Sequence, residues 1–248
     1  MMIKPLAALA VALALAAPAA AEELTPEEVK RLALEAILEN PEIVMEAVAI
    51  LRERDEAAQA AATEAAIVEM RAALEADPNA PVLGNPEGDV TVVEFFDYNC
   101  PYCKQASGEV KALMAADANV RLVYREWPIL GEGSVYAARA ALAAREQGKY
   151  EEFHWALMED RARKDEAGVL RIAEAVGLDV ERLKADMEGE AVMSHIAQSM
   201  AMAQSLGFSG TPSFVIGRQA VFGFVPQSDL AAIVADARAE PTGEAAGE

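Results

Sequence analysis

The sequence holds two cysteines, Cys100 and Cys103, separated by Pro101 and Tyr102. They follow an apolar segment, residues 90–96, and precede a segment with the composition of a helix. A thiol at a helix N-terminus faces unpaired backbone N–H groups and the positive end of the helix dipole, which favour the thiolate. Pro101 suits the first helical turn, where a missing N–H costs little. The spacing therefore predicts thiol–disulfide exchange, in which Cys100 attacks a disulfide and Cys103 resolves the mixed disulfide.

Metal binding is the main alternative use of two such thiols. Zinc needs two further ligands, and the only histidines, His154 and His195, lie far from the cysteines in the sequence. Each histidine is expected to be a packing or surface residue. Copper(I) binding by the two thiolates stays open as a minor side activity, because soft ligands select that ion. No resident metal or other cofactor is expected.

The first 21 residues have the pattern of a secretory signal peptide. Lys4 gives a positive start, residues 6–17 are apolar, and three alanines precede Glu22. The apolar stretch is too short to span a bilayer core of about 30 Å. An exported chain with a C-x-x-C pair is expected in the periplasm, where disulfides are made and corrected.

The charge of the chain limits its partners. The sequence contains 21 basic and 41 acidic residues, a formal net charge of −20. Nucleic acid is not expected as a partner, because its binding requires a basic surface. A chain of 248 residues is long enough for one domain with a sizeable core and an appendage.

Residues 22–76 are expected to form a helical stalk. A capping box between Thr25 and Glu28 starts one helix, and apolar residues recur at helical spacing through residues 41–76. A single helix over residues 41–76 would be roughly 54 Å long. Because one domain of this size cannot cover that length, the stalk is expected to associate with other copies of the chain. The alternative, that it folds back on its own domain, stays open.

A linker, residues 77–89, is rich in proline and glycine and precedes a domain expected at residues 90–239. This domain begins with a strand, a helix and a second strand. A helical insertion at about residues 134–206 comes next, and a strand hairpin and a closing helix complete the domain. The order predicts an α/β fold. Residues 240–248 are expected to be a disordered tail.

Two stretches of this domain, residues 92–103 and 207–217, resemble the DsbA family of thioredoxin-fold proteins. The resemblance implies a thioredoxin-like fold with an inserted helical domain. It implies that Pro212 is a cis-proline whose loop, with Thr211 just before it, lies beside the active-site disulfide. It also implies that Glu94 is a buried acid beneath the disulfide. A carboxylate in an apolar strand is costly, and near Cys103 it can relay the proton of that thiol.

The sequence says less about whether the cysteine pair oxidises, reduces or isomerises the disulfides of its substrates. Tyr102 stands where the DsbA family usually has a histidine, and a neutral phenol stabilises the thiolate less than an imidazolium does. Thr211 and the N-terminal extension resemble disulfide isomerases and ScsC-type suppressor-of-copper-sensitivity proteins. The hypothesis is an oligomeric disulfide isomerase or reductase. The alternatives are a monomeric dithiol oxidase and a non-catalytic periplasmic chaperone or copper-binding module. The expected partners are cysteine-containing exported proteins, a membrane thiol–disulfide redox partner and other copies of the chain.

Overall fold

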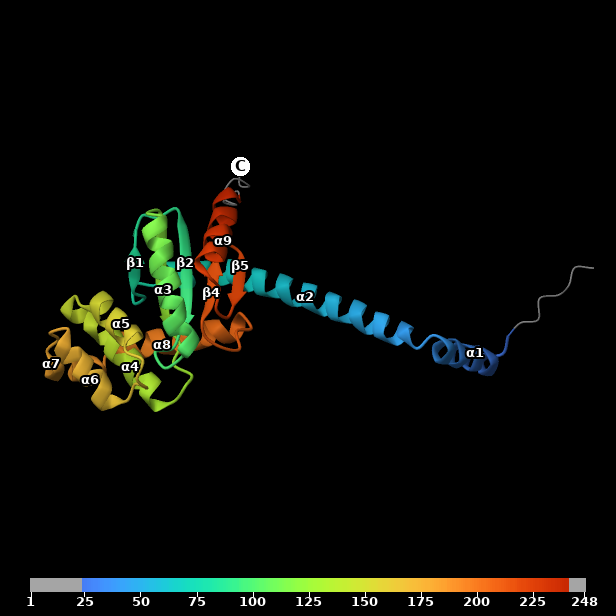
Figure 1. The fold of residues 1–248 in the computed structure, drawn as a ribbon, viewed down its shortest axis with the longest axis horizontal. Helices are drawn as coiled ribbons and strands as arrows, with labels where there is room; N and C mark the ends of the chain where they lie inside the picture. Colours follow the sequence, from blue (N-terminus) through green and yellow to red (C-terminus); the bar gives the residue numbers. More distant parts are fainter. Residues whose placement is uncertain (1–23, 241–248) are drawn as a thin grey trace, which may run out of the picture. The chain divides into compact units, whose positions relative to one another are not determined.

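The computed structural model describes residues 24–240. The predicted signal peptide, residues 1–21, and residues 241–248 of the predicted tail lie outside the described residues. The chain forms two compact units; the first ends at Asp55 and the second begins at Glu56. The elements, labelled in Figure 1, are α1 (Pro26–Glu39), α2 (Glu42–Glu75), β1 (Val82–Gly84), β2 (Val90–Phe96), α3 (Pro101–Ala116), β3 (Val120–Glu126), α4 (Glu132–Ala143), a 3-10 turn (Ala144–Gln147), α5 (Tyr150–Glu159), α6 (Glu166–Ala175), α7 (Val180–Asp186), α8 (Glu190–Ser205), β4 (Ser213–Ile216), β5 (Gln219–Phe222) and α9 (Gln227–Ala239).

The second unit is built on a mixed five-stranded sheet of order β1-β3-β2-β4-β5. β2 lies at its centre, parallel to β3 and antiparallel to β4. Six of the seven residues of β2 are buried, as expected for a β-branched and aromatic strand covered on both faces. A parallel strand-helix-strand unit followed by a hairpin confirms the predicted α/β, thioredoxin-like fold.

The helical insertion lies between β3 and β4 and contains α4 to α8. α4 contacts α5, α6, α7 and α8. Its buried face consists largely of alanines, which let these neighbours approach closely. α5 also contacts α3, so the insertion packs against the helix that carries Cys103.

The sheet separates two apolar clusters. Val92 and Phe96 belong to a cluster that includes residues of α3, α9 and the inserted helices. Val93 and Phe95 belong to a second cluster with residues of α2. Successive residues of β2 alternate between the clusters because successive side chains of a strand point to opposite faces of the sheet.

The expected stalk boundary at residue 76 is wrong for the second half of α2. Ile67 and Leu74, on one face of this helix, are buried in the second cluster. Arg125, fully buried on β3, supports this packing by donating to the Ala73 carbonyl and to Asp77, the latter at 2.6 Å. Residues 56–75 therefore belong to the globular unit, because their apolar face covers one face of the sheet.

The expected linker, residues 77–89, also differs from the structure. Val82–Gly84 form strand β1, which pairs antiparallel with β3. Tyr124 donates its backbone N–H to the Pro81 carbonyl at 3.0 Å. Prolines and glycines indicated an irregular segment here, but a short strand at a sheet edge tolerates them at its ends.

The first unit consists of α1 and the beginning of α2. The capping box of α1 is formed: Glu28 donates its N–H to the Thr25 hydroxyl at 3.3 Å, and Thr25 donates its N–H to the Glu28 carboxylate at 2.9 Å. No residue of α1 is buried, and Val29 and Leu32 are among its exposed apolar residues. Among residues 24–240, no helix has the length and apolar character that crossing a membrane requires.

Candidate functional site

Cys100 is the N-cap residue of α3, and Cys103 lies in the first turn of this helix. β2 delivers the chain to this point, and Pro101, at the first helical position, starts the helix with a backbone angle that suits it. Cys100 donates its N–H to the Asp97 carbonyl at 3.0 Å, which closes the turn between β2 and α3. Both cysteines are free thiols; Cys100 is 5% exposed and Cys103 is fully buried.

Residues 207–217, the second of the two stretches that resemble the DsbA family, contact the cysteines through Thr211. The Cys100 sulfur lies 3.2 Å from the Thr211 carbonyl oxygen, although 111 residues separate them in the sequence. The Thr211–Pro212 peptide bond is cis, as the resemblance implies. The loop that contains this bond leads directly into β4, which pairs with β2, so the sheet itself holds the loop beside the cysteine.

Hydrogen bonds lower the pKa of Cys100 to about 6. The largest contribution is the hydrogen bond from the Cys103 side chain; Thr211 and the backbone N–H groups of Tyr102 and Cys103 add to it, and burial opposes it. The backbone groups do not reach the geometry of a capping hydrogen bond, so they act as nearby dipoles. The Thr211 carbonyl accepts only from the protonated thiol. The donors outweigh this carbonyl, and with a pKa of about 6 the thiolate is the predominant form of Cys100 at neutral pH.

Burial has the opposite effect at Cys103 and Glu94. It raises the pKa of the Cys103 thiol, and the hydrogen bond with Cys100 and the nearby Cys100 and Glu94 charges raise it further. Burial also raises the pKa of Glu94 to about 8, with a second contribution from the Cys100 charge. Glu94 lies on β2 between Tyr124 of β3 and Phe214 of β4. Its Oε2 atom has no hydrogen-bond partner among the described residues.

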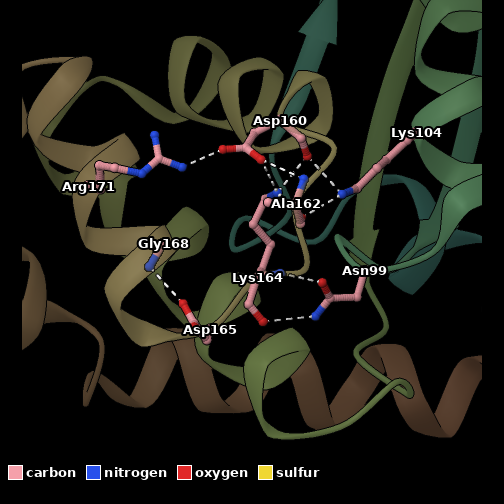
Figure 2. Close-up of polar contacts among 8 residues, drawn as sticks. All are labelled: Asn99, Lys104, Asp160, Ala162, Lys164, Asp165, Gly168 and Arg171. Carbon is pink, nitrogen blue, oxygen red and sulfur yellow. Dashed lines mark hydrogen bonds and ion pairs between the residues drawn. The ribbon is translucent and has the colours of Figure 1, made fainter.

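Asp97 and Asn99, which the sequence reasoning missed, hold the turn before Cys100. Asp97 accepts from the backbone N–H groups of Asn99 at 2.7 Å, Ile129 at 2.8 Å and Leu130 at 2.9 Å. Asn99 accepts from the Lys164 N–H at 2.6 Å and donates to the Lys164 carbonyl at 3.2 Å, as Figure 2 shows. Two Asx residues between a strand and the cysteines were the available sequence signal, because such side chains bond to nearby backbone.

The remaining candidates divide between the surface and the core. Pro101 and Tyr102 are exposed beside Cys100, Tyr102 by 62%. The two histidines are buried and contact residues other than the cysteines: His154 Nδ1 lies 2.9 Å from the Tyr98 hydroxyl, and His195 Nε2 lies 2.7 Å from Glu126. Within residues 24–240, no group of three or more His, Cys, Asp or Glu side chains is arranged to hold a metal ion.

A thioredoxin-like sheet, a low-pKa thiol at the N-cap of a helix, a buried second thiol and a cis-proline loop define the site of a thiol–disulfide oxidoreductase. The chain belongs to the DSBA-like thioredoxin domain family, whose model matches residues 91–235.

Solved structures agree with this assignment. A thioredoxin-like oxidoreductase from Silicibacter pomeroyi DSS-3 is 68% identical, with a TM-score of 0.68 over 69% of this chain and 99% of that one. The thiol-disulfide exchange protein alpha-DsbA2 from Wolbachia pipientis is 27% identical, with a TM-score of 0.67 over 72% of this chain and 97% of that one. A linker-deletion mutant of Proteus mirabilis ScsC is 25% identical, with a TM-score of 0.67 over 89% of this chain and 98% of that one.

Curated relatives extend well beyond the matched region. The Na⁺/H⁺ antiporter NhaA 3 of Salinispora tropica is 36% identical over 168 residues, which are 65% of this chain and 26% of the antiporter. The chain thus spans about a quarter of the length of the curated relatives that it matches.

Proposed function

We propose that this protein is an exported, periplasmic thiol–disulfide oxidoreductase that exchanges disulfides with cysteine-containing proteins. The observation that carries the proposal is the contrast between its two thiols: the pKa of Cys100 is lowered to about 6, and that of Cys103 is raised. Such a pair has one nucleophile ready at neutral pH and one thiol held in reserve.

The reaction proceeds in two exchanges. The Cys100 thiolate attacks one sulfur of a substrate disulfide, a Cys100–substrate disulfide forms, and the other substrate sulfur leaves as a thiolate that takes a proton from water. Cys103, once deprotonated, attacks the Cys100 sulfur and releases the second substrate thiolate. The substrate disulfide is reduced, and Cys100 and Cys103 become oxidised to a disulfide. The reverse sequence introduces a disulfide into a substrate dithiol.

Glu94 is the group that takes the Cys103 proton in this proposal. The negative charge of the Cys100 thiolate contributes to the raised pKa of Glu94. Forming the mixed disulfide removes that charge, so the pKa of Glu94 falls and its carboxylate becomes more populated at the step that requires a base. The first exchange therefore prepares the second.

Thr211 and Pro212 are the proposed substrate-positioning residues. Their loop places a backbone carbonyl 3.2 Å from the Cys100 sulfur. An extended substrate segment can pair with the backbone beside that carbonyl and so bring its own sulfur to Cys100. Pro101 and Tyr102, exposed on the other flank of Cys100, are proposed to modulate the active site.

We further propose that the protein is a homo-oligomeric isomerase or reductase that associates through its N-terminal helices. Large apolar side chains are exposed along this region, among them Val29, Leu32, Ile43 and Val44. Exposed apolar residues at helical spacing favour a helix partner. Isomerisation benefits from several reduced sites facing one captive substrate, whereas oxidation requires one site. A monomeric dithiol oxidase is the second candidate, and the lowered pKa of Cys100 favours it, because a stabilised thiolate makes a disulfide more oxidising.

Removing residues 22–55 tests the oligomeric proposal. A deletion to Ala76 would also remove Ile67 and Leu74, whose burial contributes roughly 1.5 to 3 kcal/mol each. The shorter deletion is expected to give a folded monomer by light scattering that still reduces insulin and loses most ability to refold scrambled ribonuclease. Leu32→Lys in the full chain should weaken the oligomer, and the control Lys30→Gln should not. A monomeric full chain, or a truncated form that isomerises as well as its parent, would favour the oxidase.

A further inference from the structure

A pocket of about 760 Å³ lies beside the active-site turn. Its walls come from α3 and from the end of α5 with the loop that follows it, and Asn99 and Pro101, the neighbours of Cys100, form part of its lining. A volume of this size accommodates a small ligand or a few residues of a peptide. Neither Thr211 nor Pro212 lines it.

The pocket is basic although the chain is strongly acidic. Its charged lining residues are four cations, Lys104, Lys111, Arg161 and Arg163, and one carboxylate, Glu159. Lys111 pairs with Glu159 at 2.7 Å. The other three cations form no ion pair with a carboxylate of residues 24–240: Arg163 donates to the Leu130 carbonyl at 3.0 Å, and Arg161 has no hydrogen bond with another residue in that range. An excess of positive charge is therefore open to a ligand.

The contacts of Lys104 explain why the carboxylates of the chain do not neutralise the charge of this pocket. Its ammonium donates to the carbonyls of Asp160 at 2.8 Å and Ala162 at 3.1 Å. The buried ammonium of Lys164 donates to the same two carbonyls, as Figure 2 shows. The Asp160 carboxylate is already engaged by Arg171 at 2.6 Å and Lys164 at 3.3 Å. Two ammonium groups thus share neutral acceptors, and an anion in the pocket would relieve their repulsion.

We propose that this pocket binds carboxylates of an acidic polypeptide segment next to the substrate cysteine. The proposal rests on the proposed function, since it names a substrate class for the same active site. The position of the pocket beside Cys100 allows a substrate to place its sulfur at the thiol and its acidic residues against α3. The pocket also supplies local attraction for acidic proteins, which a chain with a net charge of −20 repels at long range.

A binding measurement tests the pocket without relying on catalysis. The probes are two short peptides with serine in place of cysteine, one flanked by glutamates and one by glutamines, measured by titration calorimetry on the full chain. The glutamate peptide should bind roughly tenfold more tightly, and salt at about 1 M should remove most of the difference. The double variant Arg161→Gln with Arg163→Gln should reduce the preference for the glutamate peptide by about threefold or more. Lys184→Gln, an exposed lysine outside the pocket, makes a matched control that should retain it.

The cysteine forms of the two peptides, supplied as mixed disulfides with a neutral thiol, provide the turnover readout. A wild-type preference for the glutamate peptide in turnover that Arg161→Gln with Arg163→Gln diminishes supports the proposal. Equal binding of both serine peptides, or an unchanged preference in the double variant, overturns it. Failure of the wild type to turn over either cysteine peptide contradicts the proposed function, while the calorimetry still decides the pocket.

Discussion

The two ends of the active site place chemically identical thiols in opposite environments. We call Cys100 with Thr211 the mouth, and Cys103 with Glu94 the floor. In the mouth, hydrogen-bond donors gather around a sulfur at the end of a helix, and the pKa of Cys100 is about 6. In the floor, a fully buried sulfur lies near a buried carboxyl, and the pKa values of both groups are raised. The surrounding elements, and not the residue type, shift the pKa values of the two thiols in opposite directions.

In the proposed reaction, this difference sets the order of the two exchanges. The mouth is charged before a substrate arrives, whereas the floor becomes reactive after the mouth has lost its charge to a mixed disulfide. If the two environments were alike, either cysteine would attack and complexes of both would accumulate.

The largest expected effect separates the two thiols directly. Cys103→Ser leaves the nucleophile in place and removes the group that resolves the mixed disulfide, so it should accumulate covalent complexes with substrate proteins. Cys100→Ser removes the nucleophile and should yield at least tenfold fewer complexes, because the remaining thiol is buried and protonated. Non-reducing gels of both variants after exposure to oxidised substrate measure this ratio. Similar amounts of complex from the two variants would show that the mouth and floor do not have separate roles.

The second prediction concerns the floor and its pH dependence. A raised pKa means that the folded protein disfavours the ionised form of Glu94. Below pH 4.5, the ordinary pKa of a glutamate, Glu94 is protonated in both states and does not change the free energy of unfolding. Above it, the free energy of unfolding decreases as the pH rises, until the pH passes about 8, the pKa of Glu94 in the folded protein. Glu94→Gln removes this decrease, so the reduced variant should become more stable than the wild type by between about 2 and 5 kcal/mol at alkaline pH.

Turnover should change in the opposite direction. Without a carboxylate to take the Cys103 proton, Glu94→Gln should resolve mixed disulfides about tenfold more slowly or worse. Urea unfolding across pH 5 to 9 and single-turnover resolution measure the two effects on the same variant. The control Glu152→Gln, an exposed residue of α5, should change neither. A stability gap that does not widen with pH, or an unaltered resolution rate, would remove Glu94 from this role.

Local sequence patterns predicted the central strands well. Residues 90–96, 120–126 and 213–216 are rich in β-branched, aromatic or other apolar residues and are bounded by turn-forming residues, and the structure has strands at these positions. The same local reasoning located Cys100 at the start of a helix. These features depend on neighbours in the sequence, so a single sequence contains the information.

Features that depend on distant residues could not be predicted in this way. The pairing of Asn99 with Lys164 joins residues 65 positions apart. The sequence of α2 continues across Asp55 without a glycine or proline, yet Ile67 and Leu74 are buried and Ile43 is exposed. The basic pocket collects Lys104 and Arg161 from separate elements. In each case the position of a partner, which the sequence pattern does not specify, decides the outcome.

The smallest expected effect tests how the mouth sets the pKa of its thiol. The Thr211 side chain contributes to the lowered pKa of Cys100, and its contribution is smaller than that of Cys103. Thr211→Val keeps the shape and removes the hydroxyl, so the pKa of Cys100 should rise from about 6 by less than about 1 pH unit. The thiolate of the reduced protein is then less stabilised, and the reduction potential should fall by less than about 30 mV. Thr211→Ser retains the hydroxyl and should stay close to the wild type in both measurements. The pH dependence of Cys100 alkylation and equilibration with glutathione supply the two readouts; a valine variant that matches the wild type in both would assign the low pKa to Cys103 and the helix alone.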